Sequence, residues 1–431
     1  MAKRPKQLNK IRKLFRNPTM FFRDSRYFNY LLSKMKHTKP FLEGRIVAHG
    51  IRVNEWKREY IKDRYPEYEW IFYSFNTSAK QVFKSIKNPE NHRIIVWGYN
   101  ETADFTQLAN EVGVSLYRME DGFIRSIGLG ANHELPLSLV LDKTGVLYFD
   151  SRKESGLERL LNEYDFDGDS NLMNRAKNAM SLLTTNGVSK YNHLASQSAL
   201  DVYSKYCPFN SAKKRILIIG QVETDASIKF GADKPLNNGA LVWQARKCNP
   251  EADIFFKPHP DTLAGKREVI TPLDVISKFA YVVSDELSLS DSFETIDEVY
   301  TITSLSGFEA LLRGKKVITL GCPFYSGWGL THDLQENPRR NRQLTLEQLF
   351  AASYILYPDY FDYFLTSKSD IENVLEVLSY EIKTKKCIEG KKDGLELNSI
   401  GLNKTIAHGV RVNEWKREYI KDRYPEYEWI F

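Results

Sequence analysis

Short apolar runs alternate with amphipathic stretches along most of the chain. The runs RIVAHG, EWIFYSF and RIIVWGY are typical of buried strands, while VNEWKREYIKDRYP and TADFTQLANEVG have the spacing of amphipathic helices. After a helical middle, the alternation resumes with RILIIG, ADIFFKPHP, EVYTITS and KKVITLG. Strands that alternate with helices form parallel sheets, so the pattern predicts an α/β chain with two Rossmann-like parallel-sheet domains.

The same pattern predicts how the chain divides. We expect a basic helical tail at 1–40, a first Rossmann-like domain at 41–150, a helical connection at 151–212, a second Rossmann-like domain at 213–340, closing helices at 341–385 and a linker at 386–406. Two such domains facing across a cleft describe a GT-B-like glycosyltransferase architecture, in which the ligand binds beyond the carboxyl ends of the strands. Other two-domain α/β enzymes share this layout.

One segment of the chain occurs twice. Residues 48–72 return at 407–431 with a single difference, Ile51 against Val410. A lone strand–helix–strand unit cannot bury its faces. We therefore expect that the chain is part of a longer protein, or that the second copy is mobile or exchanges with the first. We expect no function in the repeat itself.

The charge is distributed unevenly. The formal net charge is +6, yet residues 1–40 hold twelve Lys and Arg against one acid, Asp24, so the remainder of the chain is net acidic. Basic residues interleaved with aromatic ones suit an anionic membrane surface, although a tail packed on the main body is an equal alternative. The acidic body argues against a nucleic-acid partner.

Cysteine use and hydropathy limit where the protein acts. Four scattered cysteines form no C-x-x-C pair and predict neither a disulfide framework nor a zinc site. No apolar run is long enough to span a membrane, and the N-terminus lacks the apolar core of a signal peptide. We therefore expect a cytoplasmic protein that is peripheral on the inner membrane.

Two loops in the second domain are suited to bind an anion. In FFKPHPDT, Pro258 ends a buried strand and leaves His259 in a rigid loop beside Lys257, where the imidazole can donate to a phosphate oxygen. In TITSLSGFEALLRGK, Ser304, Ser306 and Gly307 begin a helix, whose free N–H groups favour negative charge. A turn-capping histidine, a capping serine and a packing glycine are the structural alternatives.

Acidic side chains follow a predicted strand in each domain. Glu120 and Asp121 lie in RMEDGFIRS, and Glu223 and Asp225 lie in GQVETDAS. Sugar transfer uses one carboxylate at the anomeric carbon and another that exchanges the proton of the acceptor. Arg125 can bind a substrate carboxylate, although an acidic turn with a salt-bridged arginine is as common.

Five motifs in this order, EDGFIRS, GQVETDAS, KPHPD, TSLSGFEALLRGK and FYSGWGLT, make residues 115–335 resemble the bacterial retaining β-Kdo transferases. That family includes the capsule polysaccharide enzymes of the KpsC and LipB type and related modules that cap lipopolysaccharide O-antigen chains. The resemblance implies a GT-B-like fold, the donor CMP-β-Kdo, a lipid-linked or polysaccharide acceptor, no metal or other cofactor, and retention through a covalent intermediate.

The resemblance also implies roles for individual residues. Asp225 becomes the expected nucleophile with Glu223 as its rival, and Glu120 the expected general acid/base with Asp121 as its rival. His259 is the third expected catalytic residue, because it would stabilise the charge that grows on departing CMP. The donor-binding set then comprises Lys257, Ser304 and Ser306 at the CMP phosphate, Arg125 at the Kdo carboxylate, Glu309 at the ribose, and Gln221, Gly307, Tyr325 and Trp328. The last two offer stacking surfaces, although a buried aromatic corner explains them nearly as well.

Two other functions fit the same residues. A different CMP-sugar transferase, such as a sialyl-type enzyme, has the same carboxylate-bearing ketose donor. A noncatalytic module that positions glycan chains at the membrane is the more distant alternative.

Overall fold

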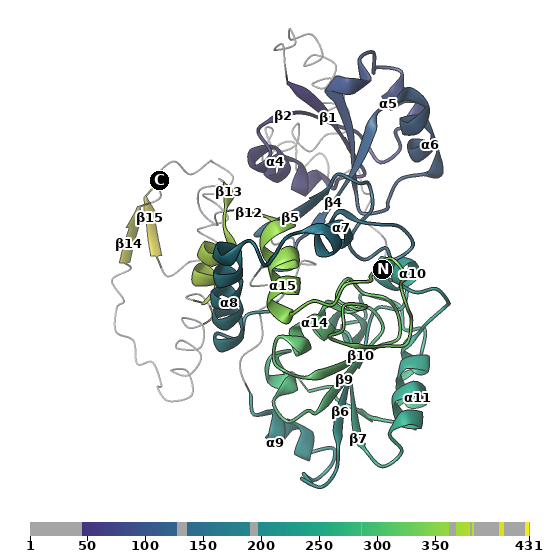
Figure 1. Ribbon diagram of the computed structural model, residues 1–431, viewed down its shortest axis with the longest axis vertical. Helices are drawn as coiled ribbons and strands as arrows, with labels where there is room; N and C mark the ends of the chain where they lie inside the picture. Colours follow the sequence, from purple (N-terminus) through teal and green to yellow (C-terminus); the bar gives the residue numbers. More distant parts are fainter. Residues whose placement is uncertain are drawn as a thin grey trace, which may run out of the picture. The chain divides into compact units, whose positions relative to one another are not determined.

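The computed structural model describes residues 45–126, 136–189, 197–285, 287–361, 368–379 and 382, together with the strand backbones at 405–408 and 427–430. The chain separates into two compact units, one that ends at Ile382 and one that begins at Lys383. The first unit contains two sheets with helices around them (Figure 1). In the part of the chain described, no helix has both the length and the apolar character needed to cross a membrane.

The first sheet has a parallel core and an antiparallel side. Its strands are β1 (Ile46–Ile51), β2 (Tyr68–Phe72), β3 (His92–Trp97), β4 (Ser115–Asp121), β5 (Ser138–Asp142), β12 (Asp359–Phe361) and β13 (Lys368–Ser369), in the order β13-β12-β5-β4-β3-β1-β2. Strands β1 to β4 pair in parallel, as predicted, whereas β5, β12 and β13 pair antiparallel. The sequence predicted the parallel core of this sheet but not its antiparallel strands.

Alternation along β3 explains how this sheet buries both faces. Ile95 packs into one apolar cluster with α4 (Glu55–Arg64), while Ile94 and Val96 pack into another with α5 (Ala79–Phe83) and α6 (Ala103–Val112). Successive strand residues point to opposite faces, so one run of apolar residues supplies two cores.

All six strands of the second sheet are parallel. They are β6 (Arg215–Ile219), β7 (Asp253–Lys257), β8 (Tyr281–Val282), β9 (Glu298–Thr301), β10 (Lys316–Thr319) and β11 (His332–Asp333), in the order β11-β10-β9-β6-β7-β8. The helices that follow these strands are α10 (Ala226–Gly231), α11 (Asn238–Cys248), α12 (Pro260–Leu263), α13 (Leu273–Ile276) and α14 (Leu305–Leu311). The central strand β6 is buried along its whole length.

Connecting helices pack beside the two sheets. They are α7 (Gly156–Glu163), α8 (Ser170–Thr185), α9 (Ala199–Ser204) and α15 (Leu346–Phe350), which continues into a π-helical segment at Ala351–Leu356; residues 371–379 are also helical. The stretch 341–385, expected to be helical throughout, also supplies β12 and β13 to the first sheet. Phe361 enters the core of that sheet, and burial of its ring favours the strand pairing over helix.

The second copy of the duplicated segment forms the same strand pair as the first. Strands β14 (Thr405–His408) and β15 (Tyr427–Ile430) run parallel, and Thr405 lies opposite Tyr427 just as Ile46 lies opposite Tyr68. The rest of this copy, the linker and the basic tail at 1–40 lie outside the described residues, as do the expectations of mobility, exchange and membrane binding attached to them.

Candidate active site

Three loops of the candidate site lie at one edge of the second sheet. Strand β6 lies between β7 and β9 and parallel to both, so the segments after these strands emerge at the same edge. The backbone amide of Gly220 donates to the carbonyl of Lys257 at 2.9 Å, and the side-chain Nε2 of Gln221 donates to Thr303 Oγ1 at 3.2 Å. The structure thus brings together the loops that carry Asp225, His259 and Ser304.

His259 follows β7 and caps the short helix α12. Its Nδ1 accepts a hydrogen bond from the backbone N–H of Asp261 at 3.2 Å. Because Nδ1 accepts, a neutral ring carries its proton on Nε2. The imidazole is partly buried and held by its own loop, as the predicted turn-capping alternative requires.

Lys257 is the last residue of β7. Its Nζ donates to the carbonyl of Leu287 at 2.7 Å, and burial lowers the pKa of its ammonium group to about 8. The side chain is therefore still mostly protonated at neutral pH, but an added anion would strongly favour the charged form.

The start of α14 is capped as the sequence predicts. Ser304 Oγ accepts from the amide of Ser306 at 3.2 Å, and the hydroxyl of Tyr325 donates to the carbonyl of Ser304 at 2.5 Å. Both serines are partly exposed. Gly307 is buried, and a Cβ there would collide with the Tyr325 hydroxyl, so its close approach is to this ring.

Three side chains expected to contact the donor are buried in this structure and present little surface to a ligand. Glu309 is 2% exposed and has its carboxylate 3.9 Å from Nη1 of Arg313. Tyr325 and Trp328 are fully buried, and the indole N–H of Trp328 donates to the carbonyl of Phe324 at 2.8 Å. The buried aromatic corner, and not the stacking surface, describes these rings.

The carboxylates of GQVETDAS have different surroundings. Glu223 accepts from the amides of Asn238 at 2.8 Å and Thr271 at 2.8 Å, and from the Thr271 hydroxyl at 2.5 Å. Asp225 is exposed and caps α10 by accepting from the amide of Ser227 at 2.8 Å. Glu223 therefore joins its own loop to the segments at Asn238 and Thr271 by hydrogen bonds. Asp225 is the carboxylate that is accessible to a ligand.

Gln221 has a structural part as well. Its side-chain oxygen accepts from the amide of Thr303 at 2.9 Å, and its side chain is 7% exposed. It joins the loop after β6 to the loop after β9, so it supports the donor loops from within and presents little surface to a donor.

Asp121 is held between two buried cations. Its carboxylate lies 3.1 Å from Nζ of Lys57 and 2.7 Å from Nε of Arg125. Arg125 is 2% exposed, which matches the salt-bridged alternative for this arginine and leaves it no open face toward a Kdo carboxylate. Burial lowers the pKa of Lys57, and the adjacent Asp121 opposes that effect.

Glu120 points to the other face of β4, as an extended backbone requires. Its Oε1 accepts from the amide of Asp121 at 3.0 Å, and its Oε2 lies 3.3 Å from where a Cβ on Gly98 would stand. Gly98 has a φ of +60°, which glycine adopts without strain. A glycine at the end of β3 thus leaves space beside the carboxylate of Glu120.

The loop after β3 contacts the helix that Asp225 caps. The rings of Tyr99 and Phe230 are 4.7 Å apart, and the amide of Ser151 donates to the carbonyl of Phe230 at 3.1 Å. Tyr99 follows Gly98, and Phe230 lies in α10. Glu120 lies beside Gly98, and Asp225 caps α10. The residues next to these two carboxylates therefore pack against each other.

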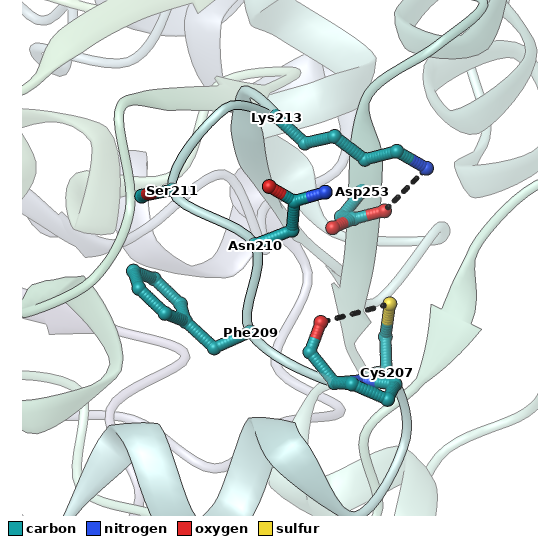
Figure 2. A pocket seen from close by; sticks show the side chains of 7 residues that line it. Cys207, Phe209, Asn210, Ser211, Lys213 and Asp253 are labelled. Carbon is teal, nitrogen blue, oxygen red and sulfur yellow. Dashed lines mark hydrogen bonds and ion pairs between the residues drawn. The ribbon is translucent and has the colours of Figure 1, made fainter.

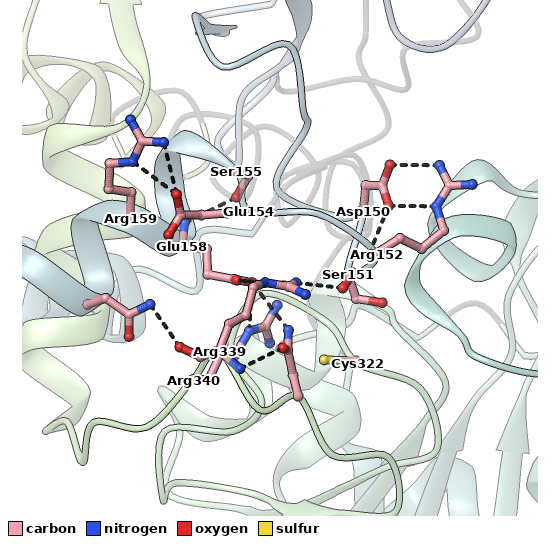
Figure 3. Close-up of polar contacts among 12 residues, drawn as sticks. Asp150, Ser151, Arg152, Glu154, Ser155, Glu158, Arg159, Cys322, Arg339 and Arg340 are labelled. Atoms are coloured by element: carbon pink, nitrogen blue, oxygen red, sulfur yellow. Dashed lines mark hydrogen bonds and ion pairs between the residues drawn. The ribbon is translucent and has the colours of Figure 1, made fainter.

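Sequence reasoning missed a buried ionic cluster that braces the motif FYSGWGLT (Figure 3). Glu158 on α7 is 3% exposed and lies 2.5 Å from Nε of Arg339 and 3.1 Å from Nε of Arg340. Arg340 also donates from Nη1 to the carbonyl of Ser326 at 2.8 Å. The adjacent arginines in NPRRN were the available signal, but their partner is distant in sequence.

Comparisons with known proteins agree with this architecture. Residues 92–360 match the family model described as capsule polysaccharide biosynthesis protein. The chain is 42% identical over 330 residues to the lipopolysaccharide-processing protein LpsZ of Rhizobium meliloti, covering 76% of this chain and 73% of LpsZ. It is 36% identical over 382 residues to the capsule polysaccharide modification protein LipA of Neisseria meningitidis serogroup A, and spans 52% of LipA.

Two solved structures are similar over nearly their whole length. The Thermosulfurimonas dismutans KpsC beta Kdo 2,4 transferase is 31% identical, with a TM-score of 0.63, over 77% of this chain and 98% of that one. The KpsC beta Kdo 2,7 transferase from the same organism is 34% identical, with a TM-score of 0.61, over 78% and 99%. The predicted GT-B-like α/β fold with two Rossmann-like sheets is confirmed. The chain belongs to the capsule polysaccharide biosynthesis protein family.

Proposed function

We propose that this protein is a retaining β-Kdo transferase that moves Kdo from CMP-β-Kdo to a lipid-linked or polysaccharide acceptor in capsule or lipopolysaccharide biosynthesis. The observation that carries the proposal is the similarity to two KpsC structures described as beta Kdo transferases, at 31% and 34% identity over almost all of each. Membership of the capsule biosynthesis family supports a bacterial surface glycan as the acceptor.

The donor phosphate binds where three anion-suited groups meet at the edge of the second sheet. His259 follows β7, Lys257 ends it, and the partly exposed Ser304 and Ser306 lie at the start of α14, where the helix dipole favours negative charge. As CMP departs, negative charge grows on its phosphate, and donors that are already oriented stabilise it without reorganising. Loss of one such donor costs about 3 kcal/mol of transition-state stabilisation.

The reaction proceeds in two displacements. The carboxylate of Asp225 attacks the anomeric carbon, the bond to the CMP phosphate breaks, and a glycosyl ester forms on Asp225. The acceptor hydroxyl then gives its proton to Glu120 and attacks the same carbon, which releases Asp225. Two inversions give net retention. Asp121 is unsuited to proton transfer because its carboxylate is engaged by Lys57 and Arg125.

Two further parts of the proposal concern partners. The leaving phosphate is met by protein cations and N–H groups, so we propose that turnover needs no divalent metal. The basic tail at 1–40 attaches the protein to the anionic inner membrane surface, where lipid-linked acceptors are accessible. Sedimentation with phosphatidylglycerol vesicles, lost when residues 1–40 are deleted, tests the second point.

Intact-mass analysis after mixing with CMP-Kdo tests the mechanism. Wild type should gain one Kdo residue, and Asp225→Asn should not, because asparagine keeps the α10 cap while it removes the nucleophile. Asp169→Asn, which alters another helix-capping carboxylate on α8, is the matched control and should label like wild type. An adduct that persists in Asp225→Asn refutes the assignment, and labelling by CMP-sialic acid but not CMP-Kdo refutes the donor.

A further inference from the structure

A pocket lies at the opposite edge of the second sheet from the candidate active site (Figure 2). Its volume is about 470 Å³, and its walls are Cys207, Pro208, Phe209, Asn210, Ser211, Lys213 and Asp253. All but the last belong to the segment between α9 and β6, and Asp253 is the first residue of β7. Because β6 and β7 are parallel, this amino edge is the far end of the strands from His259. We call it the Asp253 pocket.

Arg215 is buried beside this pocket. It is the first residue of β6 and lies directly opposite Asp253 in the strand pairing. Its side chain is buried, with the residue 3% exposed, and its guanidinium lies 5.1 Å from the ring centroid of Phe209, which lines the pocket, and 5.0 Å from that of Phe255. Among the described residues, Nη1 and Nη2 of Arg215 donate to no acceptor.

A buried guanidinium group is energetically costly when its nitrogens have no hydrogen-bond acceptor. A buried donor that makes no hydrogen bond costs about 1–3 kcal/mol, and nearly all buried donors in folded proteins have an acceptor. The lowered pKa of Arg215 has burial as its main cause. Lys213 lies 3.8 Å from Asp253, and the carboxylate of Asp297 accepts from the backbone N–H of Arg215 at 2.8 Å, so both cations have a nearby carboxylate while Nη1 and Nη2 of Arg215 still lack an acceptor among the described residues.

The chemistry of the two nitrogens defines what fits them. Arg215 lies behind the pocket wall rather than in it, with its guanidinium among the rings of Tyr203, Phe209 and Phe255. Its Nη1 and Nη2 form the end of a planar fork, whose spacing matches two oxygens of one carboxylate or phosphate group. Phe209, 52% exposed, lies next to the guanidinium and is the side chain that must turn aside for a ligand to reach it. Turning an exposed ring needs little loss of packing.

We infer that the Asp253 pocket binds a small oxyanion, a carboxylate or phosphate group, through the Nη1 and Nη2 fork of Arg215 with Lys213 as a second cation. The site is separate from the donor loops, because it lies at the other end of β6 and β7. It does not depend on the identity of the sugar that the protein transfers.

Thiol labelling measures binding directly, because Cys207 lines the pocket and is partly exposed. The full chain is alkylated with iodoacetamide in sodium phosphate, in sodium pyruvate, or in sodium chloride of equal ionic strength, and labelling at each cysteine is followed by peptide mass. At ten times the dissociation constant of the anion, Cys207 should react about tenfold more slowly. Cys248, which is exposed on α11, should react at an unchanged rate and serves as the internal control.

Variants decide whether Arg215 is responsible. Protection should disappear in Arg215→Gln and persist in Arg159→Gln, a control at an exposed arginine. Phe209→Ala should give protection at lower anion concentrations, and this exposed position decides the matter if Arg215→Gln does not fold. Equal protection by chloride, protection that survives in folded Arg215→Gln, or no gain in Phe209→Ala would overturn the inference. Phosphate or pyruvate acting alone would support it and identify the group.

Discussion

Lys257 and His259 are neighbours in one loop, yet their protons are controlled differently. The histidine is oriented by a hydrogen bond to Nδ1, whereas the lysine is controlled by burial, which lowers the pKa of its ammonium group from 10.5 to about 8. At the scale of single residues, this loop therefore contains one side chain fixed by geometry and one cation whose charge depends on pH.

The affinity for CMP should depend on the charge of Lys257. Below pH 8 the amine is protonated and attracts the phosphate, and above pH 8 binding requires uptake of a proton, so the affinity should fall as pH rises from 8 to 9.5. Calorimetric titration of CMP across this range measures the fall. Lys257→Met should bind more weakly at every pH and show a flat profile; a fall of the same size in that variant would exclude Lys257 as its cause.

Substitutions of Asp121 and Glu120 should affect different properties, the first stability and the second catalysis. Asp121→Asn leaves Lys57 and Arg125 buried without a balancing charge, and we expect the free energy of unfolding to drop by about 3 kcal/mol. Glu120→Gln should abolish turnover with a change in stability below about 1 kcal/mol. Urea unfolding and CMP release distinguish the two. Equal destabilisation by both variants would show that Glu120 is structural as well.

Among the elements, α14 depends on the loop that follows β10. The Tyr325 hydroxyl donates to the carbonyl of Ser304 and occupies the space where a side chain on Gly307 would lie. The aromatic corner of FYSGWGLT therefore sets the position of the start of α14 from within the core.

Gly307→Ala should destabilise the protein by about 2 kcal/mol, because the new methyl group collides with the Tyr325 ring and with the methyl group of Thr301. Tyr325→Phe removes the hydroxyl with which the new methyl group collides. The free energy of unfolding lost in the double variant should therefore be about 1 kcal/mol smaller than the sum of the losses in the two single variants. Chemical unfolding of all four proteins measures this coupling. Strictly additive losses would mean that the collision is relieved elsewhere.

For the whole molecule, the division at residue 382 is the main structural fact. Both sheets, with all the residues assigned to the candidate active site, lie in the first unit. The duplicated pair β14 and β15 forms a sheet of its own.

A chain shortened to residues 1–385 should therefore fold and work. Its free energy of unfolding should lie within about 0.5 kcal/mol of that of the full chain, because no strand or core residue of the first unit is removed. Thermal unfolding and CMP release from CMP-Kdo give the comparison. A shortened chain that unfolds more easily would mean that the duplicated segment supports the first unit.

Local sequence determined the features that depend on neighbours along the chain. The apolar runs RIIVW and RILII predicted buried strands. Pro258 predicted the end of β7, and Ser304 predicted a helix start. Periodicity, a missing N–H and a capping hydroxyl act within a few residues, so each leaves its mark in the local sequence.

Only the tertiary structure decided which polar and aromatic side chains face a ligand. Lys57 reaches Asp121 across 64 positions, and Arg340 reaches Glu158 across 182, so neither pair is visible in a local pattern. Trp328 is likewise buried, and β12 joins the first sheet from a distant part of the chain. The physical reason is that the partner that satisfies a buried charge or ring comes from distant parts of the chain, and folding alone brings the two together.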